Sequence, residues 1–163
     1  MLIRIAGTVS ESIVDGPGIR YTIFTQGCPH HCEGCHNPET HDFSGGRLAD
    51  TDIAENPLLK GVTFSGGEPF CQPAPLYDLA KRIKENTKLD IMAYTGFTFE
   101  QLVEKSKTDE DVKNLLSVVD ILVDGKFILA QRSLELHFKG SRNQRIIDCK
   151  KSLETGNVVI KEL

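Results

Sequence analysis

The chain of 163 residues carries 19 Lys and Arg against 23 Asp and Glu, a formal net charge of −4, and 39% of its residues are hydrophobic. This length favours one domain over residues 1–163, and the lack of a basic excess argues against a nucleic-acid partner. No apolar stretch approaches membrane-spanning length and the N-terminal residues lack a signal-peptide layout, so we expect a cytoplasmic protein with no membrane partner.

The first part of the chain is predicted to form two strands joined by a turn. Residues 2–9 can pair as a strand, a DGPG sequence then gives a strong turn signal, and residues 19–25 are rich in β-branched and aromatic side chains. The second strand runs directly into the cysteine loop, residues 28–35 (CPHHCEGC). Residues 36–60 look irregular, with one short helix predicted to begin near Asp50.

From residue 61 onward, the chain alternates between apolar strands and amphipathic helices. Strands are predicted over residues 61–65, 89–94 and 118–123, and helices over residues 75–85 and 99–116, the second with a polar break near residues 106–109. Such alternation is typical of parallel βαβ units, in which binding sites gather at the carboxyl ends of the strands. The cysteine loop and the GGEP, YTG and DGK sequences each follow an apolar strand, so we expect them at one mouth.

The remaining residues are predicted to add strands to the sheet. Residues 134–138 alternate like a strand, residues 140–145 form a polar loop, and residues 157–160 suit a last strand. The chain is too short for a complete eight-stranded barrel, which takes roughly 250 residues. The predicted fold is therefore α/β, an incomplete and open (β/α) barrel with a mainly parallel sheet.

Three of the five cysteines, Cys28, Cys32 and Cys35, stand in the cysteine loop. Such crowding suits a reducing compartment and metal ligation better than a disulfide framework. Three thiolates can hold an iron–sulfur cube while one iron stays open for a substrate or cofactor. The alternative is a zinc site, although zinc sites usually carry a second Cys-x-x-Cys or Cys/His pair, which this chain lacks. Four histidines could supply its fourth ligand: His30, His31, His36 and His41.

A second motif comprises Gly66, Gly67 and Glu68 of the GGEP sequence, which closes an apolar strand. Adjacent glycines let a ligand approach the backbone, whose carbonyls, with the carboxylate of Glu68, could accept hydrogen bonds from an ammonium group. The alternative is a Gly-Gly turn followed by a solvated glutamate. Of the two remaining cysteines, Cys71 is interpreted as a small buried thiol, with a reactive role near the mouth as the alternative. Cys149 lies in a polar segment and is given no role.

These motifs together resemble a known superfamily. The C-x₃-C-x₂-C spacing after one strand and GGEP after the next are similar to the radical S-adenosylmethionine superfamily, and DGPGIR at residues 15–20 resembles its glycyl-radical-enzyme activases. The resemblance spans about residues 5–148, and its most discriminating segment is GSRNQR at residues 140–145. Further segments narrow it to the activating proteins of anaerobic ribonucleoside-triphosphate reductases: residues 27–30 (GCPH), 36–40 (HNPET), 94–96 (YTG), 120–125 (DILVDG) and 140–145 (GSRNQR).

The resemblance implies a radical SAM fold and a radical mechanism. In such activases a 4Fe–4S cluster binds S-adenosyl-L-methionine (SAM), which is cleaved reductively to a 5′-deoxyadenosyl radical. That radical abstracts a hydrogen atom from a glycine of the large glycyl radical subunit of anaerobic ribonucleoside-triphosphate reductase, where it leaves a glycyl radical. The second implied partner is a low-potential electron donor such as flavodoxin or ferredoxin.

The resemblance also implies roles for individual residues. The three cysteines of the cysteine loop would hold three irons and carry the catalysis through the cluster. Gly66 and Gly67 would receive the methionine ammonium group, and the backbone near Gly34 and His36 would touch the adenine. The implied SAM-binding residues are Gly34, Cys35, His36, Gly66, Gly67, Glu68, Thr95, Asp124, Lys126 and Arg142.

Three charged residues of this set have a second interpretation. Asp124 and Lys126 correspond to an Asp-x-Lys pair that serves a monovalent cation and the SAM carboxylate in the related formate-lyase activase, or else form a turn and a solvated cation. Residues 92–96 contain no carboxylate, which argues against a monovalent-cation site. Arg142 and Arg145 offer guanidinium forks to a carboxylate or to the partner protein, or else lie in water.

Two other functions stay open. A small radical SAM enzyme of deazapurine biosynthesis, similar to 7-carboxy-7-deazaguanine synthase, would also carry GGEP, but the GSRNQR segment is unexpected there. A non-catalytic metal-binding or electron-transfer module is the other alternative. Electron carriers usually bind every iron through protein ligands, mostly four cysteines, whereas this chain clusters only three.

Overall fold

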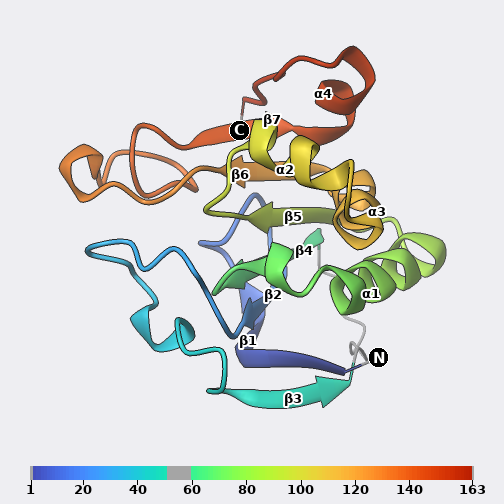
Figure 1. Cartoon of the computed structure of the whole chain (residues 1–163), viewed down its shortest axis with the longest axis horizontal. Coiled ribbons are helices and arrows are strands. Elements are labelled where there is room, and N and C mark those ends of the chain that lie inside the picture. Colours follow the sequence, from blue (N-terminus) through green and yellow to red (C-terminus); the bar gives the residue numbers. More distant parts are fainter. Residues whose placement is uncertain (1, 51–59, 163) are drawn as a thin grey trace.

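Seven strands form one sheet in the computed structural model, which describes residues 2–50 and 60–162. They are β1 (Leu2–Ser12), β2 (Arg20–Thr25), β3 (Arg47–Asp50), β4 (Gly61–Gly66), β5 (Asp90–Tyr94), β6 (Ile121–Asp124) and β7 (Arg145–Asp148). Their order across the sheet is β3-β1-β2-β4-β5-β6-β7 (Figure 1). The outer strands β3 and β7 lie at opposite edges, so the sheet is open.

The four central strands, β2, β4, β5 and β6, run parallel, whereas β1 pairs antiparallel with β2 and β3, and β7 pairs antiparallel with β6. The prediction of an open α/β sheet is confirmed. The prediction of a mainly parallel sheet is correct for the centre and wrong for the flanks, where the chain turns back on itself. The carboxyl ends of the central strands share one edge, and the long loops over residues 26–46 and 125–144 extend from it (Figure 1).

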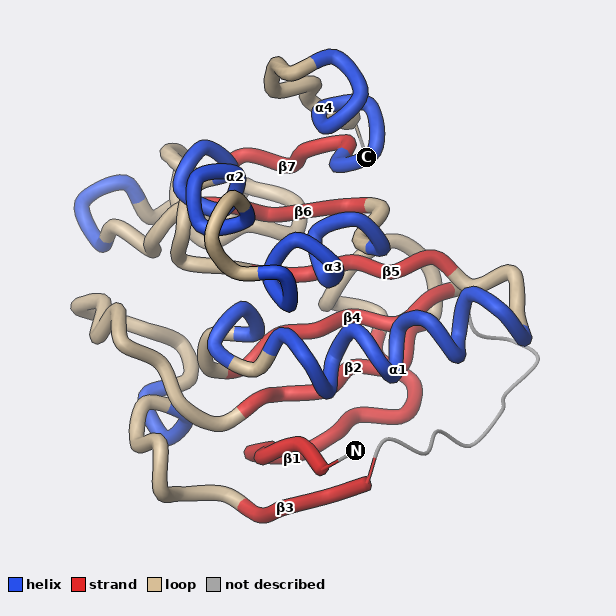
Figure 2. The backbone as a smooth tube through the Cα atoms, turned by 45° about the vertical axis from the view of Figure 1, so that its right-hand side comes forward, coloured by secondary structure: helices blue, strands red, loops and turns tan. Residues whose placement is uncertain are grey.

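Three helices cover one face of the sheet (Figure 2): α1 (Pro73–Asn86), α2 (Phe99–Ser106) and α3 (Glu110–Val118). The predicted break near residues 106–109 separates α2 from α3. Thr98 and Gln101 form a capping box at the start of α2, and the Asp109 carboxylate caps the start of α3. The short helix α4 (Cys149–Thr155) follows β7 at the edge of the sheet. No helix of the described part of the chain has the length and apolar character that a membrane crossing requires.

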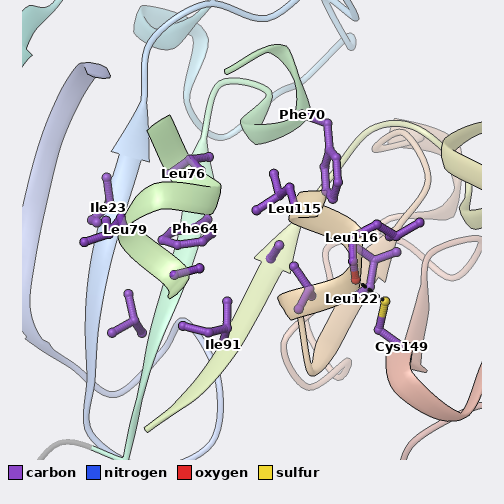
Figure 3. Packing of buried hydrophobic residues seen from close by; sticks show 14 of the residues in the cluster. Ile23, Phe64, Phe70, Leu76, Leu79, Ile91, Leu115, Leu116, Leu122 and Cys149 are labelled. Carbon is purple, nitrogen blue, oxygen red and sulfur yellow. Dashed lines mark hydrogen bonds between the residues drawn. The ribbon is translucent and has the colours of Figure 1, made fainter. Parts of the chain in front are cut away.

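The main hydrophobic core lies between the sheet and these helices (Figure 3). Phe64 of β4 and Ile91 of β5 are fully buried against Leu76 of α1 and Leu115 of α3. The apolar residues that recur at helical spacing in α1 thus lie on the face that packs against the sheet. Burial of each such side chain stabilises the fold by roughly 1.5–3 kcal/mol, so the core holds the strands whose ends carry the site.

Two strands predicted near the C-terminus are wrong. Residues 134–138 form turns and bends in the loop that follows β6, and Leu134 is 91% exposed there instead of packing on a sheet. Of residues 157–160, only Ile160 makes an isolated bridge, to Ile147. The place beside β6 is taken by β7, whose Ile147 is fully buried in the core.

The described part of the region predicted to be irregular contains a strand, β3. β3 forms there because its four residues pair with the start of β1. Asp50, near which a short helix was expected to begin, is the last residue of β3, and residues 51–59 lie outside the described residues.

Candidate functional site

A cavity of about 630 Å³ opens at the carboxyl ends of β2, β4, β5 and β6. Open parallel sheets place their ligand sites at this edge. The structure therefore brings the cysteine loop and the ends of three later strands to one mouth, as the strand pattern predicts. The predicted site residues that line the cavity are Cys28, Cys32, Cys35, His36, Gly66, Gly67 and Thr95. Those that do not line it are Gly34, Glu68, Asp124, Lys126 and Arg142.

The cysteine loop presents three free thiols to this cavity. Cys28 is buried, whereas Cys32 and Cys35 are half-buried. Burial raises the pKa of the Cys28 thiol, although the nearby backbone N–H groups of His30 and His31 act in the opposite direction. The loop is closed by the N–H of Cys35, which donates to the carbonyl of Cys32 at 3.1 Å.

The four histidines near the cysteines contact other side chains. His30 Nε2 lies 2.7 Å from Glu68, the rings of His31 and His41 are 4.9 Å apart, and His36 packs 5.1 Å from the ring of Phe127. Within residues 2–50 and 60–162, no three His, Cys, Asp or Glu side chains converge on a point where one metal ion could bind. An iron–sulfur cube needs a wider arrangement, because each thiolate binds a different iron.

Gly66 and Gly67 allow the end of β4 to pack against the end of β2 and against Gly27, which precedes the cysteine loop. A Cβ on Gly66, whose φ is 92°, would lie 2.5 Å from the backbone nitrogen of Thr25, and one on Gly67 would lie 2.4 Å from the carbonyl oxygen of Gly27. The N–H of Gly67 donates to Thr25 at 2.7 Å, and the N–H of Glu68 donates to Gly27 at 2.8 Å. The glycine pair thus fixes the cysteine loop to β4 and exposes backbone to the cavity.

Asp124 is bonded to neighbouring elements of the fold. Its carboxylate, 1% exposed, accepts hydrogen bonds from Arg145 Nε at 3.0 Å, from Arg145 Nη2 at 2.5 Å and from the N–H of Phe99 at 2.8 Å. These bonds join β6 to β7 and to the first turn of α2, and they raise the pKa of Arg145. Lys126 and Arg142 have exposed side chains outside the cavity wall.

The GSRNQR segment braces the loop that follows β6, a role that the sequence alone did not reveal. Asn143 Nδ2 donates to the carbonyl of Lys126 at 2.7 Å, and Gln144 Nε2 donates to the carbonyl of Gly125 at 2.9 Å. Gln144 Oε1 in turn accepts from the N–H of Gly140 at 2.8 Å. Gln144, Gly125 and Gly140 all line the cavity, so this segment shapes its wall.

The DGPGIR segment is anchored by a buried arginine that sequence reasoning also missed. Arg20 is fully buried and donates to Thr63 Oγ1 at 2.7 Å and to the carbonyl of Pro17 at 3.1 Å, and it forms an ion pair with Asp90. The turn is thereby held against β4 and β5. Asp15 lines the cavity beside it and accepts a hydrogen bond from Ser12 Oγ.

Aromatic side chains form part of the cavity wall. Tyr94, Phe127 and Phe138 line the cavity, and Tyr94 and Phe138 pack against a small apolar cluster around Met92. Successive residues of β5 alternate between faces, so Met92 and Tyr94 lie opposite the helix-covered core. Burial raises the pKa of Tyr94. The Tyr of the YTG sequence and the Phe that follows the DGK sequence are the signals from which this wall could have been predicted.

The two remaining cysteines lie outside the cavity wall. Cys71 ends a short 3-10 helix, η2 (Pro69–Cys71), as an exposed residue, so its interpretation as a buried residue is wrong. Partial desolvation of the thiol nevertheless raises its pKa to about 11. Cys149 is fully buried at the start of α4, on the side of the main core, although its neighbours in the sequence are polar.

Comparisons with known proteins show the family of this chain. The model of a family described as a 4Fe–4S single cluster domain matches residues 14–147. The anaerobic ribonucleoside-triphosphate reductase-activating proteins of Vibrio cholerae and Haemophilus influenzae are 38% and 34% identical to this chain, and each alignment covers 82% of this chain and 90% of the relative. The pyruvate formate-lyase-activating enzyme of Clostridium pasteurianum is 38% identical over 62% of this chain and 48% of its own length. A three-thiol loop, a family match over most of the chain and these relatives together show that the chain belongs to the anaerobic ribonucleoside-triphosphate reductase-activating proteins.

Proposed function

We propose that this protein is the activase of an anaerobic ribonucleoside-triphosphate reductase and generates the glycyl radical of that partner by radical SAM chemistry. The observation that carries the proposal is the placement of three free thiols, on one loop, in the same cavity wall as the Gly66–Gly67 turn. The printed names of the relatives point to the reductase as the target.

The donor set fits a 4Fe–4S cluster with one open iron. Cys28, Cys32 and Cys35 reach the cavity, whereas Cys149 is 0% exposed in the core and Cys71 lies outside the cavity wall. Three protein thiolates therefore leave one iron for an exogenous ligand. When it is bound together with SAM, such a cluster supplies the electron that cleaves SAM and delivers a 5′-deoxyadenosyl radical.

The residues of this chain position SAM and exclude water from the reacting groups. We assign SAM to the predicted residues that line the cavity, namely Cys35, His36, Gly66, Gly67 and Thr95. Gly34 lies within the cysteine loop itself, while the other predicted residues have the protein contacts or exposed positions described above. The aromatic wall keeps water away from the reacting groups, which protects a radical from side reactions.

The open sheet suits a protein substrate. We propose that it is the open barrel of the radical SAM superfamily and that the uncovered edge admits a glycine-bearing segment of the reductase. A low-potential donor such as flavodoxin or ferredoxin would supply the electron, and the reducing cytoplasm is the compartment in which the free thiols and such a cluster would persist.

The test begins with anaerobic reconstitution using iron and sulfide, followed by SAM and dithionite and an assay of 5′-deoxyadenosine. We expect a brown protein that forms 5′-deoxyadenosine, loss of both properties in Cys32→Ala, and retention of both in the matched control Cys149→Ala. Addition of the reductase should then produce the electron paramagnetic resonance doublet of a glycyl radical.

Two outcomes would favour one of the alternative functions. SAM cleavage that responds to a deazapurine precursor and never yields a radical on the reductase would favour the small-molecule enzyme. A reconstituted protein that cleaves no SAM, even beside the reductase, would favour the non-catalytic metal module.

A further inference from the structure

The loop between β6 and β7 (residues 125–144) is tied together by the side chain of Gln144. Gln144 Nε2 donates to the carbonyl of Gly125 at 2.9 Å, where the loop leaves β6. Gln144 Oε1 accepts from the N–H of Gly140 at 2.8 Å and from the N–H of Ser141 at 3.2 Å, where the loop returns. A primary amide can do this because it carries both donors and an acceptor. Gln144 therefore holds the start of the loop against its end.

Asn143 fastens the next residues of the same loop. Its Nδ2 donates to the carbonyl of Lys126 at 2.7 Å, and its Oδ1 accepts from the hydroxyl of Ser141 at 2.5 Å. Ser141 is fully buried, and its hydroxyl accepts in turn from the N–H of Ile128 at 3.2 Å. These bonds fix the backbone immediately before and immediately after Phe127.

The side chains held in this way pack on the cysteine loop. A Cβ on Gly34, inside that loop, would lie 2.9 Å from Leu129 Cδ1 and 3.3 Å from Phe127 Cε1. The centroid of the Phe127 ring lies 5.1 Å from that of the His36 ring. Phe127 also lines the cavity, as does His36. The β6–β7 loop thus forms the wall beside the part of the cysteine loop to which SAM is assigned above.

The position of this loop depends on its polar bonds, because it shares little of the apolar packing that holds the sheet. Residues 125–144, all within the described part of the chain, contribute no side chain to the main hydrophobic core. Leu134 is 91% exposed, and Leu129 is 42% exposed even though it fills the space beside Gly34. Loss of the amide bonds should therefore loosen the loop and leave the sheet intact.

We propose that Asn143 and Gln144 are positioning residues for SAM: they hold the β6–β7 loop, and with it Phe127, against the cysteine loop and so preform one wall of the SAM site. The proposal rests on the proposed function, since it takes SAM to bind at Cys35 and His36. A wall that is ordered only when the ligand binds lowers affinity by the cost of ordering it. Loss of either residue should therefore weaken SAM binding more than it slows SAM cleavage at saturation.

The test combines three measurements. They are the dissociation constant of SAM from anaerobic equilibrium dialysis of reconstituted protein without reductant, the rate of 5′-deoxyadenosine formation at saturating SAM, and hydrogen exchange of residues 125–142 in the apoprotein. Gln144→Met keeps the length of the side chain and removes its donor and acceptor. We expect a dissociation constant at least about fivefold higher, a saturated rate within about twofold of wild type, and faster exchange in this loop but not in β4 or β5.

Asn143→Ala should change the same quantities in the same direction. Its matched control is Asn86→Ala, at an exposed asparagine of α1 whose Nδ2 donates to the carbonyl of Arg82 at 2.8 Å. Asn86 lies outside the cavity wall, so this variant should bind SAM as wild type does.

Leu129→Ala tests the contact between the loops while leaving both amides in place. Leu129 lies outside the cavity wall, so any effect on SAM must pass through the packing on Gly34. We expect a SAM dissociation constant at least about twofold higher than that of wild type. Leu134→Ala, in the same loop but at a side chain 91% exposed, is the control and should leave the constant unchanged.

The dissociation constant decides the outcome. An unchanged constant in Gln144→Met would overturn the proposal, whether or not the loop exchanges faster, and a loss confined to the yield of glycyl radical per 5′-deoxyadenosine would assign the loop to the reductase instead. Far-UV circular dichroism and iron content check folding and loading. If Gln144→Met fails either check, an unchanged constant in Leu129→Ala overturns the proposal and a raised one supports it. A wild-type protein that binds no SAM would instead contradict the proposed function.

Discussion

Cys149 illustrates how one buried thiol ties folding stability to pH. The side chain is fully buried, and its sulfur lies 3.5 Å from the carbonyl oxygen of Leu116 in α3, to which it donates. Burial, with smaller contributions from Asp120 and Asp148, raises its pKa from 9.0 to about 12. Below pH 9 the thiol is neutral in both the folded and the unfolded chain. Between pH 9 and 12 only the unfolded chain ionises, so the folded state loses stability there.

We predict that this thiol steepens the alkaline loss of stability by up to about 1.4 kcal/mol per pH unit above pH 9. Urea unfolding of the apoprotein at pH 8, 9.5 and 10.5 gives the slope, which should be shallower in Cys149→Ala than in wild type. Ser117→Ala, at an exposed and non-titrating side chain of α3, should retain the wild-type slope. Equal slopes in the wild type and Cys149→Ala would contradict the assignment.

At the scale of elements, Asp124 and Arg145 join three pieces of the fold. The carboxylate is 1% exposed and the guanidinium 33%, and the same carboxylate accepts the N–H of Phe99 at the start of α2. Removal of one partner from a buried pair usually costs roughly 3–5 kcal/mol, because the other charge loses its compensation. Here Arg145 keeps its second partner, Glu100, at 2.8 Å.

Asp124→Ala is therefore expected to lower the free energy of unfolding by about 3 kcal/mol, at the lower end of that range. The comparison is Glu104→Gln, which breaks the exposed Lys107–Glu104 pair and should change the same quantity by less than about 1 kcal/mol. Urea unfolding at pH 7 measures both. A loss below about 1 kcal/mol in Asp124→Ala would show that the pair does not hold β7 and α2 to β6.

The elements also show what the sequence can and cannot predict. The strands β4, β5 and β6 and the helices between them follow from local periodicity, and the Asp109 cap marks the break between α2 and α3. β3 and β7 form because they pair with β1 and β6, which are not adjacent to them in the sequence. No local sequence pattern indicates such pairing. For the same reason the cysteine spacing predicts a metal loop, while the bond between His30 and Glu68 joins residues 38 apart and becomes visible only in the fold.

At the scale of the whole molecule, the site and the main core are separate. The core consists of strand and helix residues between the sheet and α1–α3, and no residue of the cysteine loop belongs to it. The cavity lies at the edge of the sheet, with a smaller apolar cluster around Met92, Ile121 and Val123 on the face opposite the helices. In small zinc domains, by contrast, the metal itself supplies the folding free energy.

This separation predicts that the chain folds without its cluster. An iron open to an exogenous ligand is exposed to oxidants, so exposure to air should bleach the reconstituted protein. The far-UV circular dichroism and the cooperative urea transition should nevertheless persist, because the buried area of the core is unchanged. Hydrogen exchange should rise in the cysteine loop and stay slow in β4, β5 and β6, and renewed iron and sulfide should reverse the change. If removal of the cluster abolishes the helical signal or the cooperative transition, the core alone does not hold the sheet, and the cysteine loop must be counted among the elements that do.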